Sequence, residues 1–428
     1  MSASGKKTST NRHYTSATYR SNFRYRLSFP ILKVLLTPVI WFLFNYRADY
    51  YDAPKDENYL ILSNHTGSLD PLMLAKSFRR PIFFVASDHL FRLGIISKII
   101  DFLVAPIPII KSKQDLQALR NISSELANGN TVALFPSGSR SVSGPEEAIP
   151  RATGKLLKIL KVPVLLYRLE GGYLSSPRWA RSHRRGKMSG RVVYKLTAAD
   201  IERSTPEELN RILYEHLDAN PYAGKERNTI NYLGRNYAQY LERIFWKCPS
   251  CLRLQSLKSE KDIVFCNCGF RLRYNARGYF EAAGNTARDQ FYAIRFPQVD
   301  SFYQWQLNEL KKDFSTEKLA SMNLRQSIFT DNEETLVLTS KARKNQKVLK
   351  GSLALYPDRL EYLDPHSGVC FRFPLAQIFD IDCIGPQRLQ FTDARDQLVY
   401  ESYNKKPRSA YKYIETIKQI KSQFLSSR

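Results

Sequence analysis

A histidine and an aspartate lie five positions apart in the segment NHTGSLDP, and together they could perform acid–base chemistry. Five positions correspond to about 140° around a helix, so His65 and Asp70 would not share a face if both were helical. A turn followed by a helix solves this, because the carboxylate can then accept from the imidazole and leave its other nitrogen free as a general base. Two structural alternatives remain open: Asp70 before Pro71 is also typical of a helix N-cap, and His65 could be a buried histidine with satisfied hydrogen bonds.

A second loop follows the apolar run TVALFP and combines small residues with an arginine. Its residues are Ser137, Gly138, Ser139 and Arg140. A small-residue loop after a strand exposes backbone N–H groups, and a guanidinium adds a planar set of donors that suits phosphate oxygens. Taken alone, however, Ser-Gly-Ser also fits an ordinary turn.

Four of the six cysteines form two close pairs, Cys248 with Cys251 and Cys266 with Cys268. The N-terminal apolar stretch lacks the features of a signal peptide, so we expect a reducing compartment, in which such pairs indicate a metal site rather than disulfides. Four thiolates at about 2.3 Å would give Zn²⁺ a closed tetrahedral site with a structural role. The C-x-C spacing of the second pair is tighter than usual, and four free cysteines are the alternative.

The elements that must position these residues alternate between short apolar runs and helical stretches. This pattern predicts an α/β domain with a mostly parallel sheet flanked by helices. Strands are predicted at 59–64, 81–87, 107–110, 131–136, 163–171 and 190–197, and helices near 71–79, 93–103, 114–127 and 151–160. A helix over 206–218 is indicated by Thr205 as N-cap, Pro206 at the first helical position and Glu208 completing a capping box. Both candidate loops therefore follow predicted strands.

Taken together, the two loops resemble the glycerolipid acyltransferase superfamily. The segments NHTGSLD and FPSGSRS are similar to the first and third sequence blocks of that family and have about the same separation, roughly 70 residues. The second block is represented by residues 109–111 and the fourth by residues 162–165. With its zinc-ribbon-like segment, the chain is similar to a bacterial branch of these enzymes.

This resemblance implies an O-acyltransferase of phospholipid synthesis. A fatty acyl group would move from acyl-coenzyme A or acyl carrier protein to the hydroxyl of a lysophospholipid, with 1-acyl-sn-glycerol-3-phosphate as the expected acceptor. His65 would take the proton from that hydroxyl, Asp70 would orient His65, and no catalytic cofactor is implied. The residues that would hold the acceptor's phosphate are Lys111, Ser137, Gly138, Ser139 and Arg140.

Three positions depart from the family pattern. Ser137 stands where the family usually has glutamate, Gly67 where a serine often follows the histidine, and Lys111 where arginine is common. These positions concern the acceptor side of the expected site more than the base, so they bear chiefly on which acceptor the chain uses.

The formal charge of +25 favours partners that carry phosphate, whether nucleic acid, anionic lipid or a nucleotide-like cofactor. Residues 178–195 contain seven basic residues. This segment could face lipid headgroups, the phosphates of coenzyme A or an acidic acyl carrier protein, and a solvated surface loop is the alternative.

The N-terminus predicts a membrane contact. Residues 1–26 are polar and basic and are expected to form a disordered tail, whereas residues 27–46 are apolar and aromatic. Lys33, Pro30 and Pro38 weaken a simple transmembrane reading. A span would also place the rest of the chain, including a thiolate metal site, outside the cytosol. We therefore expect a re-entrant or in-plane anchor at the cytoplasmic face of the cell membrane, and a buried core helix is the alternative.

Beyond residue 334 the pattern changes to seven short alternating strands and a closing amphipathic helix, which resembles a pleckstrin-homology-like (PH-like) or GRAM-like β-barrel. Cys370 and Cys383 lie in predicted strands and are expected to pack as small apolar residues.

The predicted organisation has six segments: a tail (1–26), an anchor (27–50), an acyltransferase domain (51–222), a helix and zinc ribbon (223–280), a connecting region (281–333) and a PH/GRAM-like domain (334–428). Two other functions fit part of the sequence. A zinc-ribbon nucleic-acid-binding protein fits the charge, but it has no use for the apolar N-terminal segment and the strand-end loops. A catalytically silent lipid-binding homologue fits Ser137 and the C-terminal pattern.

Overall fold

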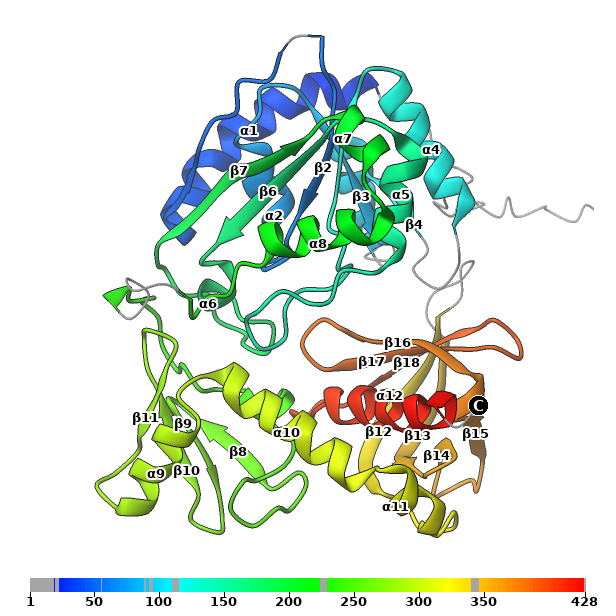
Figure 1. Ribbon diagram of the computed structural model, residues 1–428. Coiled ribbons are helices and arrows are strands. Elements are labelled where there is room, and N and C mark those ends of the chain that lie inside the picture. Colours follow the sequence, from blue (N-terminus) through cyan, green and yellow to red (C-terminus); the bar gives the residue numbers. More distant parts are fainter. Residues whose placement is uncertain are drawn as a thin grey trace, which may run out of the picture.

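A seven-stranded sheet organises the N-terminal half of the chain (Figure 1). The structure, a computed structural model, describes residues 19, 23–54, 56–87, 90–91, 95–109, 115–223, 229–339 and 346–426. In spatial order, the strands are β1 (Tyr46–Ala48), β7 (Met188–Leu196), β6 (Val164–Glu170), β2 (Leu60–Ser63), β5 (Thr131–Leu134), β3 (Ile82–Ser87) and β4 (Ile107–Ile109). Among these strands, only β6 and β7 pair antiparallel. The predicted α/β domain with a mostly parallel sheet is confirmed.

The central strand β2 is buried along its whole length, as expected for a parallel strand covered on both faces. The edge strand β1 was not predicted, because Tyr46 belongs to the apolar run expected to form the anchor. Its hydroxyl lies 2.9 Å from the hydroxyl of Tyr167 and donates to Met73 O at 3.0 Å. These long-range contacts draw the end of that run into the sheet domain.

Helices connect and cover these strands: α2 (Asp70–Ala75), α3 (Ile95–Val104), α4 (Leu116–Ala127), α5 (Ala152–Leu160), α6 (Gly172–Ser175), α7 (Ala198–Arg203) and α8 (Pro206–Leu217). The capping box at α8 is confirmed, because Thr205 and Glu208 exchange side-chain to backbone hydrogen bonds. The helix predicted over 71–79 is shorter than expected and ends at Ala75. Beyond it, Ser77 O accepts from Tyr51 N, a tertiary contact that the local pattern does not show.

Helix α1 (Phe23–Phe44) lies along the sheet domain rather than apart from it (Figure 1). It begins within the predicted tail, of which the structure describes Tyr19 and residues 23–26. The Tyr25 hydroxyl donates to Ile82 O at 2.6 Å, and Lys33 Nζ donates to a backbone carbonyl of the domain at 2.6 Å. By length and composition, α1 is a candidate membrane span, and little of it is buried inside the protein.

The cysteine-containing region forms a second, antiparallel sheet. Its strands are β8 (Leu257–Glu260), β9 (Ile263–Cys266), β10 (Arg271–Tyr274) and β11 (Phe280–Ala282). A short 3-10 helix, η3 (Leu241–Arg243), precedes it, and the helices α9 (Ala287–Arg295), α10 (Val299–Asp313) and α11 (Thr316–Ser321) follow. The hairpin predicted between the two cysteine pairs is confirmed as β8 and β9.

The C-terminal region contains the seven antiparallel strands predicted from its alternation. They are β12 (Phe329–Thr339), β13 (Gln346–Leu355), β14 (Arg359–Leu363), β15 (Cys370–Pro374), β16 (Ile378–Ile384), β17 (Arg388–Asp393) and β18 (Val399–Tyr403), with the short 3-10 helix η4 (Leu375–Gln377) before β16. The sheet order is β15-β14-β13-β12-β18-β17-β16. The predicted closing helix is α12 (Tyr411–Ser426), and its Tyr413, Ile417 and Ile420 are fully buried. Cys383 is buried as expected, whereas Cys370 is exposed and does not pack as a core residue.

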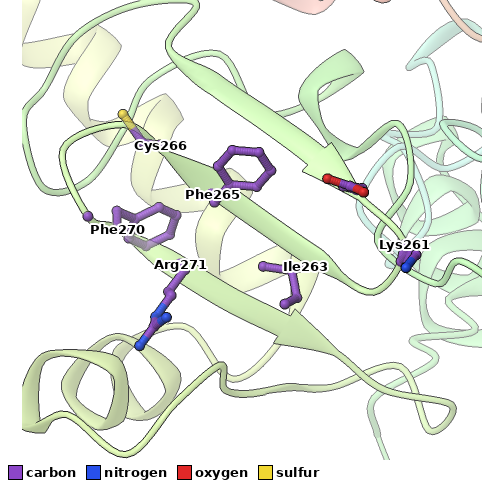
Figure 2. A pocket seen from close by; sticks show the side chains of 8 residues that line it. Lys261, Ile263, Phe265, Cys266, Phe270 and Arg271 are labelled. Carbon is purple, nitrogen blue, oxygen red and sulfur yellow. The ribbon is translucent and has the colours of Figure 1, made fainter.

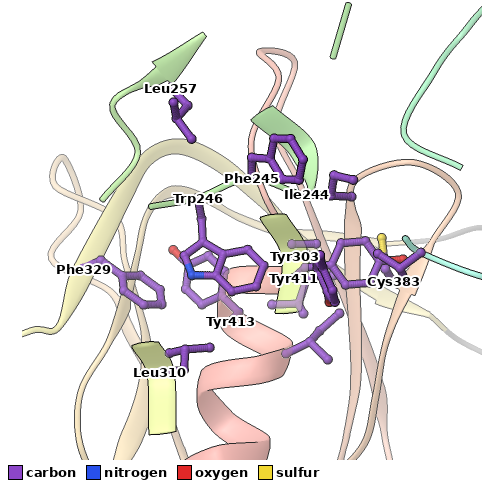
Figure 3. Packing of buried hydrophobic residues seen from close by; sticks show 14 of the residues in the cluster. Ile244, Phe245, Trp246, Leu257, Tyr303, Leu310, Phe329, Cys383, Tyr411 and Tyr413 are labelled. Carbon is purple, nitrogen blue, oxygen red and sulfur yellow. The ribbon is translucent and has the colours of Figure 1, made fainter. Parts of the chain in front are cut away.

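The described residues bury two large hydrophobic clusters. One lies within the N-terminal sheet domain. The other is continuous from the cysteine-containing sheet through α10 to the C-terminal sheet and α12. Figure 3 shows Leu257, Tyr303 and Tyr413 within it, side chains from three of these parts. The second half of the chain therefore shares one core.

Candidate active site

The turn after β2 holds the histidine and the aspartate together. His65 Nδ1 lies 2.9 Å from Asp70 Oδ2. The His65 side chain is 22% exposed, whereas the Asp70 side chain is fully buried. With Nδ1 facing the carboxylate, Nε2 is the ring nitrogen that can take a proton from another molecule.

The Asp70 carboxylate is fixed by the backbone of the same turn. Its Oδ2 accepts from the N–H of Thr66 at 2.6 Å and from the N–H of Gly67 at 2.8 Å. It makes no capping hydrogen bond to α2, whose N-cap position is Leu69. The N-cap alternative is therefore wrong. A β carbon at Gly67 would lie 3.1 Å from Asp70 Oδ1, so a larger residue there would require a small shift of the carboxylate.

Asn64 ties this turn to the neighbouring strand β6. Its Nδ2 donates to Leu169 O and its Oδ1 accepts from Leu169 N, both at 2.8 Å. Asn64 is fully buried, so the pair of hydrogen bonds satisfies an amide that water does not reach. The sequence motif contains Asn64, but sequence reasoning assigned it no role.

The loop after β5 packs against the same turn. The Phe135 ring stacks on the His65 imidazole with the ring centroids 4.5 Å apart, and Ser141 N donates to His65 O at 3.2 Å. Because β2 and β5 are neighbouring parallel strands, their carboxyl ends lie at the same edge of the sheet. The fold therefore brings the two predicted loops together.

The predicted phosphate-binding residues of this loop have different surroundings. Gly138 has a φ of 67° and donates its N–H to Phe135 O, so this group closes the turn. The Ser137 hydroxyl donates to Ser139 O at 3.2 Å. Lys111 lies outside the described residues.

The C-terminal sheet reaches this loop through Asp382, a contact that the sequence did not indicate. The Ser139 hydroxyl donates to Asp382 Oδ2 at 2.8 Å. The buried Arg178 donates from Nη1 to Arg140 O at 3.1 Å and from Nη2 to Cys383 O. Burial, reinforced by the charge of Arg178, lowers the pKa of Arg140. The loop is thus in contact with two distant parts of the chain.

Glu146, further along the same loop, is a carboxyl group that sequence reasoning missed. It is buried, and its Oε1 has no hydrogen-bond partner among the described residues. Burial raises the pKa of Glu146 to about 8, hydrogen bonds from the Ser137 side chain and the His65 backbone oppose the rise, and the charges of Glu147 and Asp70 add to it. No local motif marks this residue, because its burial depends on the path of the loop.

The four paired cysteines form one compact cluster. Cys248 Sγ lies 3.6 Å from Cys268 Sγ, Cys251 Sγ lies 3.8 Å from Cys266 Sγ, and all four sulfurs lie within 4.8 Å of one another. None of them is in a disulfide. A tetrahedral zinc site with bonds of about 2.3 Å has sulfur–sulfur edges of about 3.8 Å, so the spacing fits a metal ion.

A shallow depression of about 440 Å³ lies on one face of β9 and β10 (Figure 2). Ile263, Phe265 and Arg271 are among the side chains that line it. The two strand-end loops do not contribute to it, so it plays no part in the chemistry of His65.

The basic segment 178–195 is not a uniformly solvated surface. Arg178 and Arg184 are buried, and the Arg184 guanidinium lies 5.2 Å from the centre of the Trp179 ring. Arg185 Nε donates to Phe42 O at the end of α1. Part of the positive charge therefore serves packing within the chain.

Comparisons with known proteins agree with the position of this site. The sequence model of the acyltransferase family matches residues 48–166, and no curated protein matches the chain. Among solved structures, the 1-acyl-sn-glycerophosphate (LPA) acyltransferase PlsC from Thermotoga maritima is similar with 20% identity and a TM-score of 0.39, over 47% of this chain and 82% of that chain. The Vps36 N-terminal PH domain is similar with 16% identity and a TM-score of 0.19, over 23% of this chain and 82% of that chain.

The family match includes both strand-end loops, with His65, Asp70 and Arg140 inside the matched residues. The chain therefore contains an acyltransferase-family domain over residues 48–166.

Proposed function

We propose that this acyltransferase moves a fatty acyl group from an acyl thioester to the free hydroxyl of a lysophospholipid, with 1-acyl-sn-glycerol-3-phosphate as the acceptor. The observation that carries the proposal is the His65–Asp70 pair at 2.9 Å, held at a strand end within the family match. The donor would be acyl-coenzyme A or acyl carrier protein.

In the proposed reaction, the acceptor oxygen attacks the thioester carbonyl carbon while His65 Nε2 takes the hydroxyl proton. The new C–O bond forms, the C–S bond breaks, and the imidazolium returns the proton to the departing thiolate. Asp70 fixes the tautomer of His65 and stabilises the imidazolium. General-base catalysis of this kind contributes about 10²- to 10⁴-fold, and the reaction needs no covalent acyl-enzyme.

The loop after β5 would hold the acceptor's phosphate. Arg140 supplies a planar guanidinium, and Ser137 and Ser139 supply hydroxyl groups beside the turn that carries the base. The carboxylate of Asp382, which accepts from Ser139, would have to share this hydroxyl with a bound phosphate. The C-terminal sheet would then form one side of the acceptor site.

The outer face of α1 and α3 supports an in-plane membrane anchor. Apolar side chains with more than a third of their surface exposed gather there: Leu27, Ile31, Val34, Leu35, Val39, Trp41, Phe42, Ile99 and Phe102. We call this set the apolar face. Contacts from Tyr25 and from the Phe42 carbonyl hold both ends of α1 to the domain, so the helix lies flat against it. A helix held in this way suits insertion into one leaflet at the cytoplasmic surface better than a span.

The cysteine cluster would bind one structural zinc ion through Cys248, Cys251, Cys266 and Cys268. Four thiolates complete the coordination of zinc, so this ion would stabilise the fold rather than take part in acyl transfer. The C-terminal sheet and α12 would form a PH/GRAM-like domain, a proposal supported by seven antiparallel strands closed by a helix.

A panel of lysophospholipid acceptors tests the function directly. Purified protein in vesicles is given each acceptor with a labelled acyl thioester, once as acyl-coenzyme A and once as acyl carrier protein. We expect transfer to 1-acyl-sn-glycerol-3-phosphate and its loss in His65→Ala, which removes the base. His183→Ala is the control, because that histidine packs on Phe44 outside the loops.

Two results would contradict the proposal: no transfer to any acceptor, or activity of His65→Ala within a few fold of the unaltered protein. Salt-dependent retention of nucleic acid without acyl transfer would favour the binding-protein alternative.

A further inference from the structure

Glu146 is a buried carboxyl group that the proposed mechanism does not use. Only 9% of its surface is exposed, and its Oε1 lacks a hydrogen-bond partner among the residues that the structure describes. Buried polar atoms in proteins nearly always have a partner, so an unpartnered carboxyl oxygen beside a candidate active site needs an explanation. The family match puts the same residue inside residues 48–166.

The path of the loop explains why Glu146 arrives beside the base. Ser141 N donates to His65 O, and the Ser141 hydroxyl both donates to Pro145 O at 2.7 Å and accepts from Gly144 N at 2.9 Å. These bonds fold the segment back toward the turn after β2. Gly144 has a φ of 129°, a conformation that favours glycine.

The packing around Gly144 fixes the same path. A β carbon there would lie 2.8 Å from side-chain atoms of both Pro221 and Tyr222, so only glycine fits. The Glu146 backbone is held as well, since its N–H donates to Asp218 Oδ1 at 3.3 Å. The backbone of the loop around Glu146 is therefore held in one path by contacts from two other parts of the chain.

The groups that influence this carboxyl group belong to both strand-end loops. Ser137 and the backbone of His65 lower its pKa, whereas the charges of Glu147 and Asp70 raise it. No cation is among these groups. A carboxyl group in such surroundings favours its neutral form, which can donate a hydrogen bond to an oxygen.

We propose that Glu146 contacts the acceptor, donating a hydrogen bond to an oxygen of its glycerol phosphate beside His65. This inference rests on the proposed function. Ser137, at the position where the family usually has glutamate, offers only a short hydroxyl. Glu146 would give the site a carboxyl group from a later position of the loop. Glu146 is thus a substrate-binding residue that also restricts the acceptor to one with an oxygen at this point.

Acceptor kinetics of two variants test this. Glu146→Ala removes the donor, and we expect the KM for 1-acyl-sn-glycerol-3-phosphate to rise about tenfold while the donor's KM stays unchanged. Glu146→Gln keeps a donor of the same shape, so its acceptor KM at pH 7 should stay within about threefold of the unaltered value. Glu125→Gln is the matched control, because both oxygens of that buried carboxyl group have partners in Tyr19 and Asn130.

The pH dependence of the acceptor KM shows whether Glu146 binds the acceptor or has only a structural role. With a pKa of about 8, Glu146 is mostly protonated at pH 7 and loses its donated proton as the pH rises toward 9. The ionised form would also repel a phosphate. The acceptor KM of the unaltered protein should therefore rise between pH 7 and 9, and Glu146→Gln should lack this part of the rise.

A binding measurement distinguishes failure of this inference from failure of the proposed function. Binding of sn-glycerol 3-phosphate to the full chain at pH 7 is measured by calorimetry, with and without Glu146→Ala. If the protein transfers acyl groups and both the acceptor KM and the probe binding are unchanged in Glu146→Ala, this inference alone is overturned. If no acceptor is acylated, weaker probe binding in Glu146→Ala still supports the contact, and equal binding overturns it. If Glu146→Ala does not fold, an unaltered pH profile in Glu146→Gln overturns it.

Discussion

Asp70 shows how much of the site depends on the hydrogen bonds of one carboxylate. One of its oxygens accepts from the backbone of Thr66 and Gly67 and faces the imidazole of His65. The backbone donors fix the position of the carboxylate, and the carboxylate in turn fixes the ring. The orientation of His65 therefore does not depend on the substrate.

Asp70→Asn keeps the shape of the side chain but removes the charge that stabilises an imidazolium. We expect kcat to fall by about 10²- to 10⁴-fold while the acceptor's KM changes by less than about threefold. Steady-state kinetics at saturating donor measure this. Asp52→Asn, at an exposed aspartate, is the control. A kcat close to that of the unaltered protein would show that Asp70 has only a structural role.

Arg140→Lys tests whether the loop after β5 holds the acceptor's phosphate. A guanidinium can make two parallel hydrogen bonds to a phosphate, whereas an ammonium is a point charge. We expect the KM for 1-acyl-sn-glycerol-3-phosphate to rise about tenfold with little change in the donor's KM. Arg203→Lys, on the exposed surface of α7, is the control. A change confined to the donor would mean that this loop does not hold the acceptor's phosphate.

At the scale of elements, α1 combines two faces with different partners. One side of the helix packs Tyr25 and Phe29 into the core of the sheet domain. The other side exposes the α1 residues of the apolar face. Lys33, which weakened the membrane reading of the sequence, donates to Phe78 O and so is tied to the domain. Its charge does not prevent the opposite face from entering a membrane.

Val34→Glu combined with Phe42→Glu places two charges on the apolar face. Each exposed side chain that enters a membrane contributes about 1.5–3 kcal/mol, so we expect the bound fraction to fall at least about tenfold. Flotation with vesicles that contain anionic lipid measures it. Ile159→Glu puts a charge at an equally exposed position of α5 and should have no effect. Unchanged flotation of the double variant in high salt would place the membrane contact elsewhere.

At the scale of the whole molecule, the cysteine cluster and the C-terminal sheet depend on each other. Cys248 and Cys266 belong to the same buried cluster as Leu336 and Tyr413. A change at the cysteines should therefore reach the C-terminal sheet, while the separate core of the sheet domain stays intact.

Metal analysis checks the cluster. We expect about one zinc per chain in reduced protein, and its loss in Cys251→Ser. Removal of the metal should increase hydrogen exchange in β8, β9 and the C-terminal sheet before it affects β2 and β5. Cys370→Ser, at an exposed cysteine outside the cluster, should keep the zinc. Metal-free protein with unchanged exchange would argue against a structural metal.

Arg178 is the main link between the loop after β5 and the C-terminal sheet. Its guanidinium donates to carbonyl oxygens of Arg140, Cys383 and Gly385. Arg178→Ala leaves these buried acceptors without their donor, so we expect a loss of about 3 kcal/mol in the free energy of unfolding and a raised acceptor KM. Urea unfolding measures the first effect. Arg181→Ala, at an exposed arginine beside Tyr240, is the control, and a loss as small as its own would contradict the role of Arg178.

The sequence alone determined the features that depend on neighbouring residues. Alternating apolar runs predicted the strands, a capping box located the start of α8, and cysteine spacing predicted the cluster. It also placed His65 and Arg140 in loops after strands. These features follow from local periodicity and spacing, because hydrogen bonding and side-chain direction within an element repeat over a few residues.

Only the tertiary structure decided what those loops contact. It showed that Asp70 pairs with His65 rather than capping α2, that Ser141 of the loop after β5 bonds to the same turn, and that Asp382 reaches Ser139 from the C-terminal sheet. Distant contacts also settled two further features: Tyr51 bonds to Ser77 just beyond the end of α2, and β1 pairs with β7. Such contacts depend on the order of strands in the sheet and on which polar groups lose water on folding, and neither quantity is encoded in a local pattern.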